Sequence, residues 1–554
     1  MFTSHFIGRL IDVTFLTAFN EMQIMITQPS AKRSDVFSTI NNHWLLKQLL
    51  SVLLLSLFIL PAQAQWTKLG TDIDGESDND FSGEAISLSD DGMHVAIGAE
   101  GSSDNGTFAG HVRIYEYKNG SWQQLGNDID GDNSNDYAGG AVAISGDGKR
   151  VAVGARYHYN QTTSGSGQVR VFEYSGGSWN QIGNDLYGEA DDDRFGYSIS
   201  LSTDGSRLAV GAPENDGAAD NAGHVRVFDF SGGSWSQVGS DISGDALDDE
   251  LGFSVSLSGN GEYVVAGAPF NDDSASNAGH AKVYQYSNGS WTKKGNNIAG
   301  NEADDGSGQA VAIADEGSRV AIGAPGKNAS APFSGQVKVY EWENGSWSQL
   351  GIPLDGKGSN DFFGTSVDLT SDGSQVAIGA YNNDGNGYQN GAAYVYHFSN
   401  GSWSLLGSAI SGEAANDEAG TSVAISESGH YMAVGAPGND EMANDAGHVR
   451  VYEGDFDINV GISDVETPLP VDVSPNPFRE TLTVRYQLNK PTNIDLAVYS
   501  IDGKIVAQQS LERRAQGIHH YTLPADALSS NGNMYLLRLS ARNQVVTKRI
   551  IRIE

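Results

Sequence analysis

The chain has 554 residues, of which 33 are basic and 69 acidic, and its formal net charge is −36. Such a negative surface repels phosphate backbones and anionic lipid headgroups, so we expect no binding to nucleic acid or to a membrane surface. The chain has no cysteine, which excludes disulfides, thiolate metal sites and cysteine nucleophiles. Its 69 glycines against 14 prolines indicate many tight turns and favour an all-β protein.

Residues 1–64 are predicted to be a leader that ends in a signal peptide. A basic residue precedes an apolar run over 49–60, and Ala62-Gln63-Ala64 forms a small-x-small cleavage site. This run is too short for a membrane-spanning helix, which needs about 20 residues, so we predict no transmembrane segment. The leader is unusually long, and Met22 or Met25 is an alternative start of translation.

One sequence unit recurs seven times over residues 65–453. A tryptophan marks each copy: Trp66, Trp122, Trp179, Trp235, Trp291, Trp347 and Trp403. Neighbouring copies are 56 or 57 residues apart. A regular period of this size is typical of a solenoid or a propeller.

Each copy contains four short runs that predict strands. In the copy that begins at Trp235, these are the tryptophan segment and the runs 254–258, 264–268 and 281–286. Asn-Gly joins the fourth run to the next tryptophan segment, and Asp-Gly often joins the second run to the third. Both dipeptides favour positive φ in two-residue hairpins. The unit is therefore predicted to be a four-stranded antiparallel meander, which is the form of a propeller blade.

The two ends of the repeat region complement each other. The seventh copy ends at Glu453 without a further tryptophan strand, whereas the segment 66–70 stands alone before the first copy. We therefore predict a seven-bladed β-propeller closed by its N-terminal strand, which leaves no open sheet edge. A linear solenoid is the alternative, but it needs polar capping repeats that the sequence does not contain.

Two short motifs in the repeats resemble those of FG-GAP propellers, which are known from integrin-like and bacterial surface proteins. The matching elements are Phe195-Gly196, Phe363-Gly364, Gly211-Ala212-Pro213, Gly267-Ala268-Pro269, Gly323-Ala324-Pro325 and Gly435-Ala436-Pro437. Departures from the motifs are Glu100, Arg156 and Tyr381 for the proline, and Ser82, Ala138 and Ala419 for the phenylalanine. The calcium loop of that family, Asp-x-Asp-x-Asp-Gly, is missing, so its calcium does not carry over.

After an acidic linker over 454–470, the composition changes. Residues 471–554 carry 11 basic and 7 acidic side chains, whereas 65–453 carry 18 and 55, a net charge of −37. Alternating short runs over 471–554 predict a small Ig-like β-sandwich. Several of its elements are similar to the C-terminal sorting domain of the type IX secretion system: Pro475, Asn476, Pro477, Gly503, Tyr535 and Lys548. The resemblance implies the type IX machinery as a partner and a secreted protein, or one at the outer-membrane surface, of a Gram-negative bacterium.

An aspartate recurs between the tryptophan strand and the next inner strand. Its seven copies are Asp80, Asp136, Asp193, Asp249, Asp305, Asp361 and Asp417. One hypothesis is a ring of metal sites, for which calcium is the cofactor that oxygen ligands suggest. The other, which we favour, is that each aspartate caps a turn by accepting hydrogen bonds from nearby amides. In a meander, the loops that carry these aspartates lie on the same face as the loops between the third and fourth runs, which often carry Asn-Asp.

Four histidines begin the last strand of their copies: His111, His224, His280 and His448. Residues on different blades lie too far apart to share one metal ion. We therefore predict that these histidines make hydrogen bonds at the strand ends.

Ligand binding is expected where the copies differ. The second copy replaces the Pro-x-Asn-Asp loop with Arg156, Tyr157, His158 and Tyr159, and the sixth copy carries Tyr381 and Tyr388. Aromatic side chains of this kind stack on sugar rings or on peptide side chains. Sequence drift in a tolerant loop explains the same residues equally well.

Two hypotheses on function remain. The first is an exported protein that binds glycan or protein ligands on one propeller face, for adhesion. The alternative is an extracellular carbohydrate-active lyase or hydrolase with its site in the propeller channel. The chain has no nucleophile elbow, HExxH motif or phosphate loop. The inner strands are mostly Ser, Ala and aliphatic residues, which favours binding.

Overall fold

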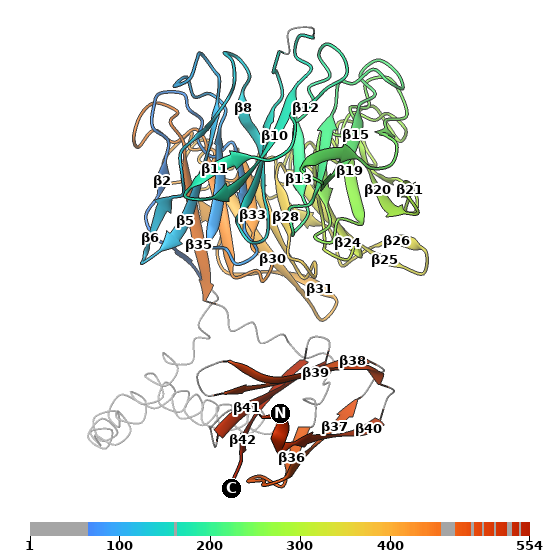
Figure 1. Cartoon of the computed structure of the whole chain (residues 1–554). Coiled ribbons are helices and arrows are strands. Elements are labelled where there is room, and N and C mark those ends of the chain that lie inside the picture. The colour runs from blue at the N-terminus through green and yellow to red at the C-terminus, as the bar shows by residue number, and fades with distance from the viewer. Residues whose placement is uncertain are drawn as a thin grey trace, which may run out of the picture. The chain divides into compact units, whose positions relative to one another are not determined.

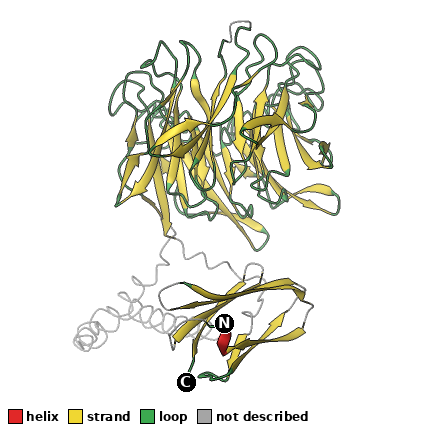
Figure 2. Ribbon diagram, in the orientation of Figure 1, coloured by secondary structure: helices red, strands yellow, loops and turns green. Residues whose placement is uncertain are grey.

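The computed structural model describes residues 65–159, 163–455, 471–488, 492–500, 504–514, 517–528, 534–541 and 544–553. Two groups of sheets lie in this part of the chain, one over 65–455 and one over 471–553 (Figures 1 and 2). Among the described residues the regular structure is strand apart from one short 3-10 turn, Ala525–Ala527. The leader and most of the linker lie outside the described residues, so the signal peptide stays a prediction.

Seven antiparallel sheets of five strands form the blades of the first group. The innermost strands are β3 (Ala85–Leu88), β8 (Ala138–Ile144), β13 (Ser198–Leu201), β18 (Ser254–Leu257), β23 (Ala310–Ile313), β28 (Val367–Leu369) and β33 (Ser422–Ile425). The second strands are β4 (His94–Ala99), β9 (Arg150–Ala155), β14 (Arg207–Ala212), β19 (Tyr263–Ala268), β24 (Arg319–Ala324), β29 (Gln375–Ala380) and β34 (Tyr431–Ala436). The third strands are β5 (His111–Lys118), β10 (Gln168–Ser175), β15 (His224–Ser231), β20 (His280–Ser287), β25 (Gln336–Glu343), β30 (Ala392–Ser399) and β35 (His448–Asp455).

The outer edge of each blade consists of two short strands, both paired with the third strand. The tryptophan strands are β6 (Ser121–Gln124), β11 (Ser178–Gln181), β16 (Ser234–Gln237), β21 (Ser290–Lys293), β26 (Ser346–Gln349), β31 (Ser402–Leu405) and β1 (Gln65–Lys68). The two-residue strands are β7 (Ile129–Asp130), β12 (Leu186–Tyr187), β17 (Ile242–Ser243), β22 (Ile298–Ala299), β27 (Leu354–Asp355), β32 (Ile410–Ser411) and β2 (Ile73–Asp74). The predicted four-stranded meander is confirmed, and the two-residue strand is an addition to it.

The N-terminal strand closes the ring. Strand β1 pairs antiparallel with β35, so that Gln65 lies opposite Asp455 and Lys68 lies opposite Tyr452. Strand β2 continues this pairing, with Ile73 opposite Val449. The seventh blade therefore has a complete outer edge, and the predicted seven-bladed propeller closed by its N-terminal strand is confirmed.

The second strand of each blade is buried on both faces, because a neighbouring blade packs against each side of it. In β9 every residue after Arg150 is buried, and the same pattern occurs in β14. Both faces of such a strand pack against apolar side chains, so its sequence is a continuous apolar run and not an alternating one. The core of the ring consists of these layers between blades.

Both kinds of predicted hairpin turn are present, but they differ in conformation. At the Asn-Gly turn of the first blade, φ is +54° at Asn119 and +88° at Gly120, as the sequence predicts. In the Asp-Gly turn of the second blade only Gly148 has positive φ, at +70°. The expectation of positive φ at Asp147 is wrong, because its carboxylate accepts hydrogen bonds from the Ser145 hydroxyl at 2.9 Å and the Lys149 amide at 3.0 Å.

The recurring tryptophans connect each blade to the preceding one. Each indole Nε1 donates to a backbone carbonyl of that blade at 2.6–3.1 Å: the acceptors, in the order of the tryptophans from Trp66 to Trp403, are Leu406, Leu69, Leu125, Ile182, Val238, Lys294 and Leu350. Trp66 donates across the point of closure. Seven equivalent bonds therefore run around the whole ring.

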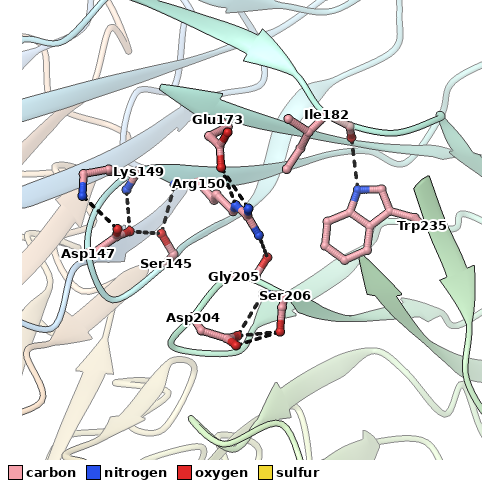
Figure 3. A network of polar contacts seen from close by, with 10 residues as sticks. All are labelled: Ser145, Asp147, Lys149, Arg150, Glu173, Ile182, Asp204, Gly205, Ser206 and Trp235. Atoms are coloured by element: carbon pink, nitrogen blue, oxygen red, sulfur yellow. Dashed lines mark hydrogen bonds and ion pairs between the residues drawn. The ribbon is translucent and has the colours of Figure 1, made fainter. Parts of the chain in front are cut away.

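A second contact joins the blades at their Asp-Gly turns. Arg150 binds the Glu173 carboxylate of its own blade at 2.9 Å and donates to the Gly205 carbonyl of the next blade at 3.1 Å (Figure 3). Arg207 and Arg319 make the same pair of contacts in their blades. The Trp235 indole and the Ile182 carbonyl lie beside this network in Figure 3.

The second group of sheets is a β-sandwich, as predicted. One sheet contains β36 (Val471–Ser474), β37 (Thr481–Leu488) and β40 (Gly517–Pro524). The other contains β38 (Thr492–Ser500), β39 (Ile505–Arg514), β41 (Met534–Ala541) and β42 (Gln544–Ile551). Phe478, Tyr486 and Tyr535 are among the largest buried side chains of its core. Within the described ranges, no helix has the length and apolar character needed to cross a membrane.

Candidate functional site

The long loops of the ring gather at one end of the strands, which we call the loop face (Figure 1). Two kinds of loop contribute to it: those between the second and third strands, such as 100–110, and those leading into the next inner strand, such as 131–137. The short Asn-Gly and Asp-Gly turns lie at the opposite end. Hydrogen bonds between the two kinds of loop confirm that they share one face, as the meander predicts.

The seven recurring aspartates lie between these loops with 1–4% of their surface exposed. Oδ2 of Asp249 accepts hydrogen bonds from the amides of Asp245 and Ala246 at 3.1 and 2.9 Å. Its Oδ1 accepts from Nδ2 of Asn271, in the other loop, at 2.9 Å. Each of the other six carboxylates accepts at least one amide hydrogen bond in the same way. These contacts are those of a turn-capping residue, and calcium binding there stays a prediction.

The divergent loop of the second copy contains one residue that is part of the scaffold. His158 has 5% of its surface exposed, and its Nδ1 lies 2.9 Å from Oδ2 of Asp136. In the third copy Nδ2 of Asn215 occupies the same place, 3.1 Å from Oδ1 of Asp193. His158 therefore joins two loops and is not available to a ligand, unlike Tyr159, which is 54% exposed.

Arg156 is the centre of a group of aromatic rings. Its guanidinium carbon lies over the rings of Tyr137, Tyr157 and Tyr197, at 5.9, 5.4 and 5.7 Å from their centroids. Both terminal nitrogens donate to the carboxylate of Glu100, at 2.5 and 2.8 Å. Burial disfavours the charge of Arg156, yet the Glu100 carboxylate raises the pKa of the guanidinium above its usual value. The arginine thus stays charged and fixed among the rings.

The group extends onto two further blades. Arg194 lies 5.1 Å over the Tyr157 ring and forms an ion pair with Glu214 at 2.7 Å. The Tyr197 ring packs on Phe253 with centroids 4.9 Å apart. We call Tyr137, Arg156, Tyr157, Arg194, Tyr197 and Phe253 the aromatic patch. All six are half-buried, so each presents part of its side chain to solvent.

Tyr381 and Tyr388 belong to a separate group. Tyr381 stacks on Phe362 with centroids 5.7 Å apart, and Phe362 in turn contacts Phe333 at 6.0 Å. Tyr388 is 66% exposed. These residues lie in loops of the fifth and sixth blades, whereas the aromatic patch lies in loops that border the second and third. The predicted ligand-binding residues therefore fall into two groups.

The two ends of the sandwich domain are hydrogen-bonded to each other. Asn476, between Pro475 and Pro477, donates from Nδ2 to the Arg549 carbonyl at 2.9 Å and accepts from the Ile551 amide at 2.8 Å. The contact lies beside Lys548 on β42. Tyr535 is fully buried in the core, and Gly503 lies outside the described residues. The side chain of Asn476 therefore joins the Pro-Asn-Pro element at the start of the domain to the basic strand at its end.

Two family models match the chain. The model described as FG-GAP repeat matches residues 188–228 and 352–396, and the model described as secretion system C-terminal sorting domain matches residues 472–554. The chain carries FG-GAP repeats and a type IX sorting domain. This sorting domain indicates a protein that is secreted or attached to the cell surface in the Bacteroidetes, a Gram-negative group, and that interacts with the type IX secretion machinery.

Comparison with other proteins adds little on activity. A search of curated proteins found no match. A structure from Bacteroides uniformis ATCC 8492, assigned as a 6-phosphogluconolactonase, has 15% identity and a TM-score of 0.42 over 60% of this chain and 86% of that chain. The periplasmic gluconolactonase of Pseudomonas aeruginosa has 14% identity and a TM-score of 0.40 over 82% of this chain and 98% of that chain. Likenesses of this degree carry no argument about function.

The FG-GAP motif has a packing role in this ring. A Cβ added to Gly154, at the GAP position of the second copy, would lie 2.3 Å from the carbonyl oxygen of Gly196, at the FG position of the third. Gly196 itself has φ of +90°, which disfavours other residues. The two glycines thus allow neighbouring blades to approach at the loop face, and this explains why they recur.

The channel of the FG-GAP propeller encloses about 340 Å³ and is lined largely by Ser, Ala and aliphatic residues of the inner strands. Four carboxylates interrupt this lining: Asp90, Asp315, Asp368 and Glu427. Burial, followed by the charges of Glu427 and Asp315, raises the pKa of Asp90 to about 6. Burial likewise raises the pKa of Asp368 to about 6, although two backbone amides oppose this shift. The channel is therefore less featureless than the inner strands suggest.

The predicted strand-end hydrogen bonds of the four histidines are not present at most of their ring nitrogens. Within the described residues neither ring nitrogen of His111 or His280 has a hydrogen-bond partner, and His224 and His448 each have one nitrogen without a partner. All four are at most 2% exposed. The prediction is therefore wrong for these nitrogens, because each is buried where no described donor or acceptor lies within hydrogen-bond distance.

Proposed function

We propose that this exported protein binds a neutral glycan or a protein surface through the loop face of its propeller. The observation that carries the proposal is the aromatic patch, in which half-buried rings surround a fixed arginine on a face formed by variable loops. Aromatic rings that are held in place contribute contact area at small entropic cost, and they stack on sugars and on apolar side chains.

The charges around the patch favour a neutral ligand over an acidic one. Arg156 and Arg194 are already paired with Glu100 and Glu214. The ring as a whole carries a net charge of −37 over 65–453. An anionic polysaccharide would be repelled at long range and would find no free cation in the patch.

Binding to a glycan array and to cell surfaces tests this proposal. Replacing Tyr137 and Tyr157 together by alanine is expected to weaken binding at least about tenfold, because two stacking surfaces are lost. Y388A removes an exposed tyrosine of the separate group and serves as the matched control. Binding by the double variant at wild-type strength would contradict the proposal, and loss only in Y388A would move the site to the sixth blade.

Delivery is tested independently of binding. Deleting 471–554 is expected to leave the propeller inside the cell envelope, since the sorting domain directs passage through the outer membrane. The variant N476A, which removes both contacts between the Pro-Asn-Pro element and β42, is expected to reduce export without removing the domain. Normal export of the deletion variant would contradict this part of the proposal.

A carbohydrate-active lyase or hydrolase is the second candidate, and the channel carboxylates are the observation that favours it. Two carboxyl groups with pKa near 6 are suited to exchange protons near neutral pH. If a polysaccharide substrate is found, D90N and D368N should each abolish turnover while leaving loop-face binding intact. Undiminished turnover in both variants would exclude the channel as the site.

A further inference from the structure

The first blade brings a buried histidine and two aspartates together at its outer edge. His111 begins β5 and lies directly opposite Asp130 of β7 in the antiparallel register. Asp128 precedes Asp130 by two residues, and side chains two apart along a strand point to the same side. One ring nitrogen of His111 and one carboxylate oxygen of each aspartate lie within 4.8 Å of one another.

The histidine in this cluster lacks the contacts that a buried imidazole needs. His111 has 1% of its surface exposed, and neither of its ring nitrogens has a hydrogen-bond partner among the described residues. An unsatisfied buried polar group costs about 1–3 kcal/mol. The carboxylate of Asp130 forms no ion pair with a described residue, and that of Asp128 accepts from Nε2 of Gln124 at 2.5 Å. The three groups therefore retain capacity for another partner.

From this geometry we infer that His111, Asp128 and Asp130 bind a divalent transition metal ion such as zinc. One neutral imidazole and two carboxylates are a common ligand set for zinc, and their two negative charges balance its charge. Asp130 is exposed and Asp128 is half-buried, so the ion can enter from solvent and keep a water molecule as a fourth ligand. Bound there, the ion would tie the two-residue strand β7 to β5 and give one nitrogen of the buried ring a partner.

Neighbouring charges are compatible with this site. Arg113, two residues after His111, is engaged by the Glu76 carboxylate at 3.0 Å and by the Asp74 carbonyl at 3.0 Å. Arg170 of the next blade binds Asp132 at 2.7 Å and reaches only the backbone carbonyl of Asp130. Among the described residues no cation forms an ion pair with either candidate carboxylate.

In two other blades, residues of the cluster are replaced. In the fifth blade the histidine is replaced by Gln336, whose amide donates to Asp355 at 2.7 Å. In the fourth blade His280 is retained, but Asn297 and Ala299 stand in place of the two aspartates. The chain itself therefore accommodates glutamine at the histidine position, and it provides a buried histidine that lacks the two aspartates of the first blade, with Asp273 3.9 Å from its Nδ1.

In the seventh and third blades a histidine also lies near two carboxylates, but in each of them a cation already holds one of the two. Asp72, beside His448, accepts from Lys68 at 2.7 Å and from Arg450 at 3.1 Å. Glu189, beside His224, pairs with Arg226 at 3.4 Å. Of these three clusters of described residues, that of the first blade is the one in which no cation pairs with a carboxylate.

Zinc titration of the untagged chain over 65–554 tests the inference, with isothermal calorimetry and thermal unfolding as readouts. Wild type and H280Q are expected to bind one equivalent of zinc that H111Q does not bind, and zinc should raise the unfolding temperature of the first two only. Imidazole resonances of His111 should shift on zinc addition. Equal zinc binding by H111Q and wild type, or no binding by wild type, would overturn the inference, as would a response to calcium alone.

A gain of binding provides a second test that does not depend on loss of stability. The variant K293Q/N297D/A299D gives His280 of the fourth blade the two aspartates of the first. It also replaces Lys293, whose Nζ contacts Asn297 at 2.9 Å, by the glutamine that the first blade has at this position. It is expected to bind one equivalent more than wild type, and H280Q in that background should remove the added equivalent. An unchanged stoichiometry in K293Q/N297D/A299D would show that the three side chains do not suffice and would overturn the inference.

Discussion

Positions that are alike in all seven copies of the repeat have a different role in this ring from positions that differ between copies. The tryptophans and the recurring aspartates are buried or nearly so, and their polar atoms bind backbone groups of neighbouring segments. The divergent loop that contains Tyr157 presents partly exposed rings on one face. A residue repeated in every blade is therefore best understood as scaffold, whereas a ligand site is expected where the repeat is broken.

The difference between repeated and divergent positions also bears on whether the recurring aspartates bind metal or cap turns. Seven aspartates in equivalent loops resemble a ring of metal sites when only the sequence is considered. In the structure their oxygens accept backbone and Asn hydrogen bonds, as in Asp249 with Asn271. The inferred zinc site lies instead in one blade. Among the residues that the structure describes, no other blade combines a histidine and two carboxylates without a competing cation.

The largest expected effect comes from opening the ring. Deleting 65–74 removes β1 and β2, exposes the edge of β35 and breaks the Trp66 bond to Leu406. We expect the unfolding temperature to fall by about 10 °C or more, measured by calorimetry. A peptide of residues 65–74 added in excess should restore part of the loss. An unchanged unfolding temperature would mean that the ring does not depend on its closing strand.

The next effect separates scaffold aspartates from surface aspartates. D249A leaves two amides and the Asn271 side chain without their buried acceptor, and we expect a loss of about 3 kcal/mol in the free energy of unfolding. D220A changes an exposed aspartate of a neighbouring loop and should cost less than about 0.5 kcal/mol. Similar losses in denaturant unfolding would contradict the assignment of the recurring aspartate to the scaffold.

A pH-dependent effect is expected at His280. Burial, followed by the charge of Lys282, lowers the pKa of His280 to about 4, below the value of about 6.5 in the unfolded chain. The unfolded state therefore binds the proton more readily, and stability falls as the pH drops from 6.5 toward 4. In a buffer with chelator, H280Q should be about 2 kcal/mol less sensitive to this change than wild type.

The exposed His430 provides the control for that measurement. The unfolding free energy of H430Q, measured between pH 7 and 4.5, gives the change that results from replacing a histidine outside the core. If H280Q follows the wild-type curve, the buried histidine does not titrate as its environment indicates.

The smallest effect is expected from the loss of one of the seven tryptophan hydrogen bonds between blades. W235F keeps an aromatic ring on Phe230 but loses the hydrogen bond to the Ile182 carbonyl, so a cost of about 1 kcal/mol is expected. Y388F, on the exposed loop, should cost nothing measurable. If W235F loses no more free energy of unfolding than Y388F does, the tryptophan hydrogen bonds between blades do not stabilise the ring.

Most of the fold could be predicted from the sequence, because the same pattern of strands and turns recurs in seven copies. Asn119-Gly120 fixes the outer turn, and the unpaired tryptophan segment at 66–70 predicts closure. Contacts between copies could not be predicted in the same way, since no local pattern shows that Trp235 reaches Ile182 of the preceding blade or that Gly154 meets Gly196 of the next. These contacts depend on the angle between blades, which the sequence of one unit does not specify.

The candidate site was predicted in part. The sequence marks Arg156 and Tyr157 because they depart from the repeat. It does not mark Tyr137, Arg194 or Tyr197, which occupy ordinary loop positions in neighbouring copies and join the patch only through packing between blades. It also places His158 in the site, although that side chain is buried against Asp136.

The central claim is that the divergent loop binds the ligand while the repeated positions maintain the ring. The variant Y157E/H158N/Y159D tests it most directly, because it copies Glu214, Asn215 and Asp216 of the third blade and keeps the partner of Asp136. We expect an unfolding temperature within about 2 °C of wild type, together with loss of the glycan or cell binding that wild type displays. Retained binding in this folded variant would contradict the claim.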